Sequence, residues 1–308
     1  MNLKANNLQI EKFIEFLVAQ KNLSKNTCSS YLIDINQFNK FFNGTSFSDL
    51  KEEDIQLFII HLAKSFSTKT HARKLSTLKQ FFFFLMEEKI CDANPILNFD
   101  FPKPKMNLPK ILTENEVSRL LDYCAHDNSA NGIRLTAMLE ILYSTGIRVT
   151  ELVSIKLSSF EENFTSILIR GKGGKERIVP LTESAKKSIL SYLPVRNYLL
   201  CKKEETEYLF PSNSKYKHIT RNRFFQILKN LSSKVNISQE RLSPHVIRHS
   251  FATHLLDRGV DLRIIQSSLG HSDISTTQIY THVKTKKLRE IIEKKHPLKK
   301  KLNKLTKL

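Results

Sequence analysis

The chain has 308 residues, with 49 lysines and arginines against 30 aspartates and glutamates, a formal net charge of +19 and an isoelectric point near 9.7. Its length suggests two domains, its 40% hydrophobic content excludes disorder throughout, and no apolar run approaches the ~18 residues that span a bilayer. Four scattered cysteines and an N-terminus without an apolar signal core predict a reduced, cytoplasmic protein without a disulfide framework or zinc site. The charge makes nucleic acid the first partner to consider.

The first 92 residues have the pattern of an all-helical domain. Apolar residues recur at helical spacing along four segments, over residues 8–17, 24–42, 54–63 and 67–89. The first stripe comprises Leu8, Phe13, Phe16 and Leu17. Ser24 has the place of an N-cap for the second helix, because its hydroxyl can accept from a backbone N–H of the first turn. The aromatic run 81–84 has the spacing of a core cluster, so we expect it to pack inside the domain rather than stack on bases.

A proline-rich stretch follows this domain. Four of the nine prolines lie at positions 95, 102, 104 and 109. Proline fixes φ and cannot continue a helix, so residues 93–109 are predicted to form an extended linker. Two domains are therefore expected, over residues 1–92 and 110–296.

The second domain combines helices with one small sheet. A capping box from Thr113 to Glu116 opens a helix through Cys124, and Gly146 ends a helix over residues 133–145. Two β-type runs joined by a glycine-rich turn predict an antiparallel hairpin. The runs cover residues 164–170 and 176–181, and helices resume near residues 182, 220, 245 and 261. The fold class is thus mainly α, with a four-helix N-terminal domain and a mixed α+β domain that carries a small antiparallel sheet.

The positive charge is concentrated at the C-terminus. Residues 284–308 hold 11 basic and 2 acidic side chains, a net charge of +9, whereas residues 1–105 hold 14 and 11, a net charge of +3. Leu288, Ile291 and Ile292 have i, i+3, i+4 spacing, which predicts a short amphipathic helix with a partner to pack on. Residues 297–308 form a basic tail whose role the sequence leaves open.

Histidines and an arginine share one face of the helix near residue 245. His245 and His249 have the i, i+4 spacing of metal ligands, but residue 246 is a valine where a His-Glu-x-x-His site has its glutamate. A phosphate is the better ligand, since Arg248 can bind it bidentately while His245 supplies a donor or a base. His249 and His254 are then expected to pack against the helix or cap it.

Two further cations lie beside glycines. Arg148 follows Gly146 between two helices, where its guanidinium can face an oxyanion and Glu151 can hold it in position. Alone, this pair also fits an ordinary surface ion pair. Lys172 lies between two glycines at the hairpin tip, where it can donate a proton to a ligand or simply face solvent.

The last candidate is a tyrosine. A tyrosine hydroxyl attacks phosphorus only when its proton is removed and the developing charge is stabilised. Tyr280 follows His271 in the chain. Two arginines, two histidines and one lysine around Tyr280 would meet both conditions without a metal.

The order of these residues resembles the catalytic set of the tyrosine recombinase (phage integrase) family. The matching residues are Arg148, Lys172, His245, Arg248, His271 and Tyr280. The local strings are similar to the bacterial Xer branch, and those near residues 242–283 are closer to one of its two paralogues. They read TGIRVTEL at 145–152, GKGGKER at 171–177, SPH at 243–245, FATHLL at 251–256 and LGHSDISTTQIYTH at 269–282. The resemblance covers nearly the whole chain, and only the lysine-rich end after Pro297 departs from it.

The resemblance implies a mechanism. Tyr280 would attack the scissile phosphate and form a 3′-phosphotyrosyl link, while Arg148 and Arg248 clamp the non-bridging oxygens. Lys172 would protonate the leaving 5′-oxygen. His245 and His271 would bind the phosphate and manage the tyrosine proton, with Glu151 as a support for the arginines. No metal, ATP or other cofactor is implied.

The resemblance also implies partners. An N-terminal SAM-like core-binding domain and the catalytic domain would clamp duplex DNA. The protein partners would be a XerC-like paralogue, in a heterotetramer on two DNA sites, and an FtsK-like septal DNA translocase as activator. The biological task would be resolution of chromosome dimers at a dif-like site for segregation at cell division.

Three other functions fit part of the pattern. A type IB topoisomerase has a similar catalytic set but relaxes DNA without a recombination site. An integrase of a mobile element shares the chemistry and differs in its target. A non-catalytic basic DNA-binding protein would explain the net charge but not six catalytic residue types in family order.

Overall fold

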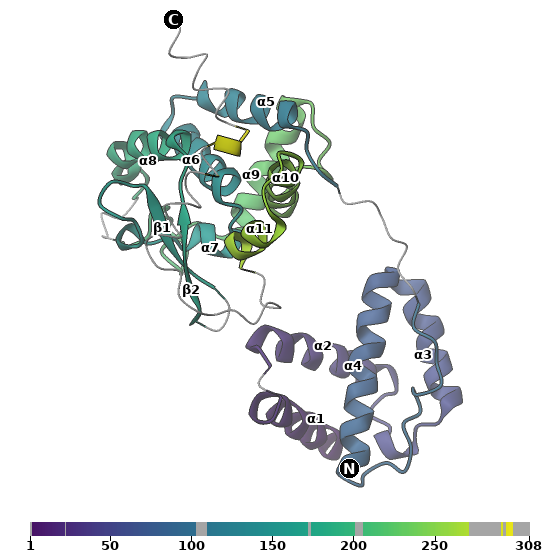
Figure 1. Ribbon diagram of the computed structural model, residues 1–308. Coiled ribbons are helices and arrows are strands. Elements are labelled where there is room, and N and C mark those ends of the chain that lie inside the picture. Colours follow the sequence, from purple (N-terminus) through teal and green to yellow (C-terminus); the bar gives the residue numbers. More distant parts are fainter. Residues whose placement is uncertain are drawn as a thin grey trace, which may run out of the picture. The chain divides into compact units, whose positions relative to one another are not determined.

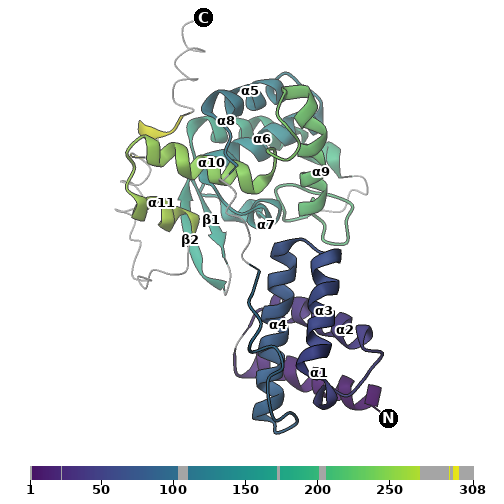
Figure 2. The ribbon, with the colours of Figure 1, turned by 90° about the vertical axis from the view of Figure 1, so that its right-hand side faces the viewer.

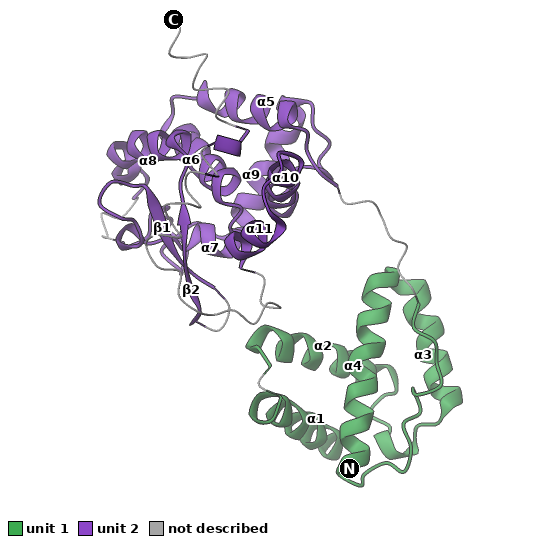
Figure 3. Cartoon of the chain, viewed as in Figure 1, with its two compact units in different colours: residues 1–108 green, residues 109–308 purple. Residues whose placement is uncertain are grey.

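The computed structural model describes residues 2–21, 23–102, 110–171, 174–200, 206–270, 291 and 294–297. The chain divides into two compact units, residues 1–108 and residues 109–308 (Figure 3). Each unit has its own buried apolar core. Within the described ranges, no helix is long and apolar enough to cross a membrane.

Four α-helices build the first unit (Figure 1). They are α1 (Asn2–Ala19), α2 (Lys25–Phe41), α3 (Glu52–Ser65) and α4 (Thr68–Glu87), with a short 3-10 turn at Phe47–Asp49. The Ser24 hydroxyl accepts from the Thr27 backbone N–H and so caps α2 as predicted, and Ser67 caps α4 in the same way. The four-helix prediction is therefore confirmed.

Aromatic rings fill the core of this unit. Of the run 81–84, three phenylalanines are buried and Phe83 is 41% exposed, so the predicted core role holds for three of the four. Leu8 was expected in the core but is 54% exposed, and Ile10 is buried instead. The reason is the helical period: Ile10, Phe13 and Leu17 follow i, i+3, i+7 on one face, and Leu8 lies off it.

The second unit surrounds helix α6 (Ala130–Thr145), which is buried along most of its C-terminal half. Helices α5 (Glu114–Ala125), α8 (Glu183–Arg196) and α10 (Pro244–Asp257) pack on α6. The described part of this unit also contains α7 (Val149–Val153), α9 (Arg221–Ser232) and α11 (Leu262–Leu269). In both views the hairpin lies on the side of the unit where α7 and α11 are found (Figures 1 and 2).

The predicted antiparallel hairpin is present, as strands β1 (Ser166–Arg170) and β2 (Glu176–Pro180). Ser166 pairs with Pro180 at the base, and Arg170 pairs with Glu176 next to the turn. The first strand begins two residues later than the pattern suggested. Phe164 has φ +52°, and its backbone N–H closes a turn on the Glu161 carbonyl oxygen, which precludes an extended strand there.

Part of the C-terminal segment packs on this same unit. Ile291 contacts the apolar core of the unit, and the His296 side chain is only 1% exposed. Ile291, one of the three apolar residues of the expected amphipathic helix, therefore packs on the second unit of the same chain. Leu288, Ile292 and the basic tail beyond residue 297 lie outside the described residues.

Candidate active site

The junction between α6 and α7 positions Arg148 and Glu151. Gly146 ends α6 with φ +61°, and a β-carbon there would lie 2.3 Å from a ring carbon of Phe251, so only glycine fits this turn. Arg148 is the N-cap of α7, and its backbone N–H donates to the Glu151 carboxylate over 2.7 Å. The Arg148 guanidinium donates to the same carboxylate over 3.2 Å. The predicted pair is thus formed by main chain and side chain together.

Helix α10 positions Arg248 and His245. Ser243 caps the helix and Pro244 occupies its first turn, so His245 and Arg248 lie one turn apart on the same face. The Arg248 guanidinium donates to the carbonyl oxygen of Gly146 and, over 2.8 Å, to that of Leu269. His245 is exposed. The face therefore presents a fixed guanidinium beside a solvent-accessible imidazole.

Three arginines converge on the C-terminal end of α11. The carbonyl oxygens of three successive residues each accept from a different guanidinium. Ser268 accepts from Arg177 over 3.0 Å, Leu269 from Arg248 over 2.8 Å, and Gly270 from Arg148 over 3.0 Å. A helix C-terminus carries partial negative charge, which favours cations there. Hydrogen bonds from positively charged donors are stronger than those between neutral groups, so these three contacts fix the end of α11 firmly.

The cluster of three arginines and Glu151 carries a net positive charge. Burial raises the pKa of Glu151, but hydrogen bonds and charges from Arg177 and Arg148 outweigh it, so the pKa lies below its usual range and the carboxylate stays ionised. Burial, with further contributions from Arg148 and Arg177, lowers the pKa of Arg248 to about 10. Arg248 therefore remains protonated at neutral pH. Three guanidinium groups around one carboxylate leave a positive excess suited to an anion.

Three of the six predicted catalytic residues lie outside the described residues, namely Lys172, His271 and Tyr280. Their neighbours in the chain are described. A β-carbon on Gly171 would lie 3.5 Å from Arg177 and 3.9 Å from the Glu151 carboxylate, and one on Gly270 would lie 3.1 Å from Arg177. The residues directly before Lys172 and His271 thus flank the arginine cluster.

The other histidines of this region differ from each other. His254 is buried, and its Nδ1 forms a 2.8 Å hydrogen bond with the Tyr143 hydroxyl, in keeping with the packing role expected for it. His249 is exposed on α10. Over the described ranges, no group of three or more histidine, cysteine or acidic side chains could hold a metal ion.

Arg177 was not singled out from the sequence. It lies on β2, and its guanidinium forms two hydrogen bonds with the Glu151 carboxylate, at 2.9 and 2.8 Å. The side chain is only 14% exposed. A lone arginine in a strand gives no local signal of such a contact, because its partner is distant in the chain.

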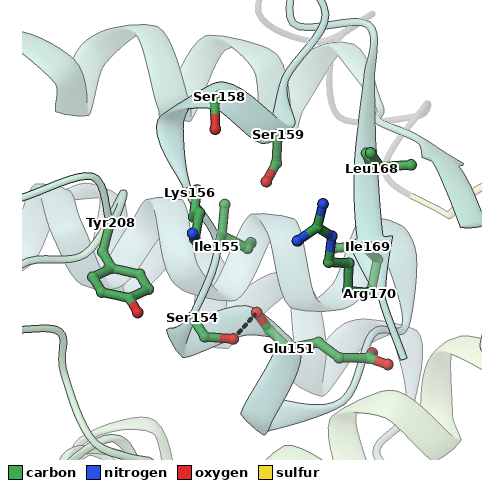
Figure 4. Close-up of a pocket in the computed structure, with 10 residues that line it drawn as sticks. All are labelled: Glu151, Ser154, Ile155, Lys156, Ser158, Ser159, Leu168, Ile169, Arg170 and Tyr208. Carbon is green, nitrogen blue, oxygen red and sulfur yellow. Dashed lines mark hydrogen bonds between the residues drawn. The ribbon is translucent and has the colours of Figure 1, made fainter. Parts of the chain in front are cut away.

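A pocket of about 330 Å³ lies beside this cluster (Figure 4). Its cations already have acidic partners: Lys156 pairs with Glu207 over 2.8 Å, and Arg170 pairs with Glu176 over 2.6 Å. Arg170 is also 75% exposed. Of the predicted site residues that the structure describes, only Glu151 lines the pocket, and its other described lining residues belong to other parts of the unit.

Comparisons with protein families give two matches. Residues 110–287 match the phage integrase family, and residues 10–89 match the N-terminal SAM-like domain of phage integrases. The resemblance read from the motifs is therefore confirmed, and so is the SAM-like character of the first unit.

Curated relatives are similar over nearly their full length. The tyrosine recombinase XerD of Rickettsia bellii (strain RML369-C) is 42% identical over 302 residues, which cover 94% of this chain and 99% of that protein. The tyrosine recombinase XerD of Rhizobium meliloti (strain 1021) is 39% identical over 304 residues, which cover 96% of this chain and 97% of that protein.

Solved structures share the fold. The XerH site-specific recombinase bound to a difH substrate, in a pre-cleavage complex, matches with a TM-score of 0.66 at 20% identity, over 92% of this chain and 81% of that one. A lambda integrase dimer bound to a COC′ core site matches with a TM-score of 0.65 at 16% identity, over 90% of this chain and 98% of that one. At these identities the likeness concerns the fold alone.

Proposed function

The chain belongs to the phage integrase family of tyrosine recombinases, enzymes that break and rejoin DNA, and from this premise we propose which of its residues carry the reaction. Tyr280 is the nucleophile. Its oxygen attacks the scissile phosphorus, the bond to the 5′-oxygen breaks, and a 3′-phosphotyrosyl link forms. The link conserves the free energy of the phosphodiester, so a 5′-hydroxyl from another duplex can reverse the step without ATP.

One observation supports this assignment most directly: Arg148 and Arg248 meet at the end of α11. They reach the carbonyl oxygens of Gly270 and Leu269, immediately before the segment that carries His271 and Tyr280. Two guanidinium groups can hold both non-bridging oxygens and stabilise the charge that develops in the transition state. Glu151 supports Arg148 through two hydrogen bonds and does not itself act on the phosphate.

Proton transfer falls to the remaining residues. Lys172, which lies between the two hairpin strands in the sequence, donates a proton to the leaving 5′-oxygen. His245, exposed beside Arg248, hydrogen-bonds the phosphate, and His271 takes part in removing the proton of Tyr280. These roles are carried over from the family residue by residue. All six positions have the residue type that the chemistry requires.

The proposed target is a dif-like chromosomal site. XerH is a relative in fold and was solved with a difH substrate, and the full-length curated relatives are XerD recombinases. We propose that this chain acts in the cytoplasm with a XerC-like paralogue, as a heterotetramer on two DNA sites, and that an FtsK-like septal translocase activates it. The task is resolution of chromosome dimers before cell division. An integrase of a mobile element is the alternative with the same chemistry.

A suicide substrate tests the nucleophile. The substrate is a duplex dif-like site with a nick that lets the cleaved fragment diffuse away, so the covalent complex accumulates. The wild-type chain is expected to yield a complex that survives denaturant, whereas Tyr280→Phe should bind the DNA and yield none. Tyr198→Phe is the matched control, because Tyr198 is 82% exposed. This variant is expected to cleave the DNA at the wild-type rate. A covalent complex from Tyr280→Phe would overturn the assignment.

The target is tested separately. Recombination between two plasmid-borne dif-like sites is measured with this chain alone, with the presumed paralogue alone, and with both. Product only with both proteins supports the two-recombinase proposal. Product from this chain alone, at a site from a mobile element but not at the chromosomal site, would favour the alternative.

A further inference from the structure

We propose that Arg177 is a positioning residue of this active site, which neutralises Glu151 and so leaves Arg148 available to the scissile phosphate. The proposal rests on the function proposed above. It concerns a residue that contacts no substrate but sets the position of one that does.

The contacts of Arg177 use its whole guanidinium. Nη1 and Nη2 donate to the two Glu151 oxygens over 2.9 and 2.8 Å, and Nε donates to the Ser268 carbonyl oxygen over 3.0 Å. This parallel two-bond arrangement with a carboxylate is the strongest that an arginine makes. Because all three nitrogens are engaged and the side chain is 14% exposed, Arg177 is fixed in place rather than waiting for a ligand.

Glu151 is the reason such a residue is needed. Its carboxylate is 5% exposed, and a buried carboxylate with a single partner is costly. The other guanidinium that donates to it belongs to Arg148, whose side chain is 40% exposed and holds the carboxylate by one bond of 3.2 Å. Without Arg177, Glu151 would draw the Arg148 guanidinium fully onto itself. The phosphate would then lose one of its two clamps.

Arg177 also joins the segments that lead to the undescribed catalytic residues. A β-carbon on Gly171 would lie 3.5 Å from its Nη1, and one on Gly270 would lie 3.1 Å from the same atom. The guanidinium thus lies between the residue before Lys172 and the residue before His271. The ion pair of Arg177 with Glu151 therefore lies close to both segments that lead to the proposed catalytic residues.

The test is the rate of covalent-complex formation by the full chain on the suicide substrate, measured in a single turnover with saturating enzyme. Arg177→Gln should lower this rate on the order of 10- to 100-fold, the loss caused by misplacing a reacting group by about 1 Å. Its affinity for the same DNA should stay within about twofold of the wild type, because Arg177 contacts no substrate. Arg170→Gln is the matched control, since it removes an exposed arginine from the same hairpin.

A second background separates positioning from simple stabilisation of the fold. In Glu151→Gln the carboxylate charge is gone, so Arg148 is no longer drawn away, and adding Arg177→Gln should slow cleavage by less than about threefold more. A loss that is as large in this background as in the wild type would overturn the proposal, as would a rate for Arg177→Gln within about twofold of the wild type.

Two further measurements keep the result readable. If Arg177→Gln does not fold, as judged by its melting temperature, Arg177→Lys is measured in its place, because it keeps the charge but loses the two-bond geometry. Arg177→Lys is expected to slow cleavage less when it is added to Glu151→Gln than when it is added to the wild type. An equal slowing in the two backgrounds would again overturn the proposal. The wild-type and Tyr280→Phe reactions run alongside: if the wild type forms no covalent complex, the proposed function has failed rather than the role of Arg177.

Discussion

The Arg148 guanidinium donates a 3.0 Å hydrogen bond to the carbonyl oxygen of Gly270, the last residue before the segment that carries His271 and Tyr280. A proposed phosphate ligand is thus tied to the main chain that leads to the proposed nucleophile. A phosphate oxygen carries more negative charge than a carbonyl oxygen and is the stronger acceptor. When DNA binds, we expect the phosphate to take over this donor, and the start of the segment to be released from it.

Gly270 itself gives the first prediction. It has φ +66°, and an added β-carbon would lie 3.1 to 3.3 Å from the guanidinium atoms of Arg177. Gly270→Ala should therefore lower the free energy of unfolding by about 1 kcal/mol. It should also slow cleavage, because the added methyl group would displace the Arg177 guanidinium. Gly259→Ala is the control: its φ is +72°, but among the described residues a β-carbon would meet only the Lys295 amine, at 3.6 Å. It should cost similar stability, measured by urea unfolding, and leave cleavage unchanged. Equal slowing by both variants would contradict the prediction.

Arg248 gives the second. Its guanidinium is held by the carbonyl oxygens of Gly146 and Leu269, and it remains charged at neutral pH although burial lowers its pKa to about 10. Arg248→Ala should slow formation of the covalent complex on the order of 10²- to 10³-fold, the usual cost of removing one transition-state donor. Arg263→Ala, which removes an exposed arginine from α11, is the charge-matched control. A loss in DNA affinity that accounts for the whole effect would argue against a transition-state role.

Local chemistry explains why much of the fold could be predicted from the sequence. Ser24 and Thr113 each cap the helix expected after them, and Gly146 ends α6 in the left-handed conformation. Such signals depend on neighbours within four residues, so they are legible in a single sequence. Where the prediction was wrong, as for the start of β1, an unusual backbone angle at Phe164 decided the outcome.

The site was predictable only in part. Arg148 and Glu151 are three residues apart, so their contact follows from the cap of α7. Arg177 is 26 residues from Glu151, and its contact depends on how the hairpin packs beside α7. Nothing in the spacing of an arginine on a strand indicates that packing. The missed residue is therefore the one whose role is set entirely by tertiary structure.

The third prediction concerns metal ions. In the proposed mechanism, the Arg148 and Arg248 guanidinium groups meet the negative charge of the phosphate, a task that a divalent cation has in many phosphoryl-transfer enzymes. Covalent-complex formation should therefore proceed at the same rate in excess EDTA as in added Mg²⁺. The measurement is a single-turnover time course under both conditions, at matched ionic strength because DNA binding depends on salt. Loss of cleavage in EDTA, restored by the metal, would contradict it.

The fourth prediction concerns His296, which fixes the C-terminal segment to the second unit. Its ring lies between those of Tyr143 and Phe251, at centroid distances of 5.2 and 5.9 Å, and its Nε2 bonds the Tyr143 carbonyl oxygen over 3.1 Å. Burial lowers the pKa of His296 from 6.5 to about 4. Between these two values the unfolded chain binds more protons than the folded chain. The neutral ring therefore makes its full contribution to the free energy of unfolding above pH 6.5. This contribution falls as the pH drops toward 4 and is lost below that value.

Replacing His296 with glutamine keeps a hydrogen-bond donor and removes the titration. At about 1.4 kcal/mol per pKa unit, the wild type should lose up to about 3 kcal/mol more than His296→Gln between pH 7 and pH 4. Urea unfolding of the full chain at pH 7, 5.5 and 4, followed by circular dichroism, measures this difference. Titrating groups that do not interact with His296 are present in both proteins and cancel in the comparison, whereas Glu114, Arg258 and buried His254 interact with its ring. His249→Gln, which changes an exposed ring on α10, is measured alongside as a histidine replacement at the surface. Parallel curves for wild type and His296→Gln would show that the buried ring does not link proton binding to the stability of the unit.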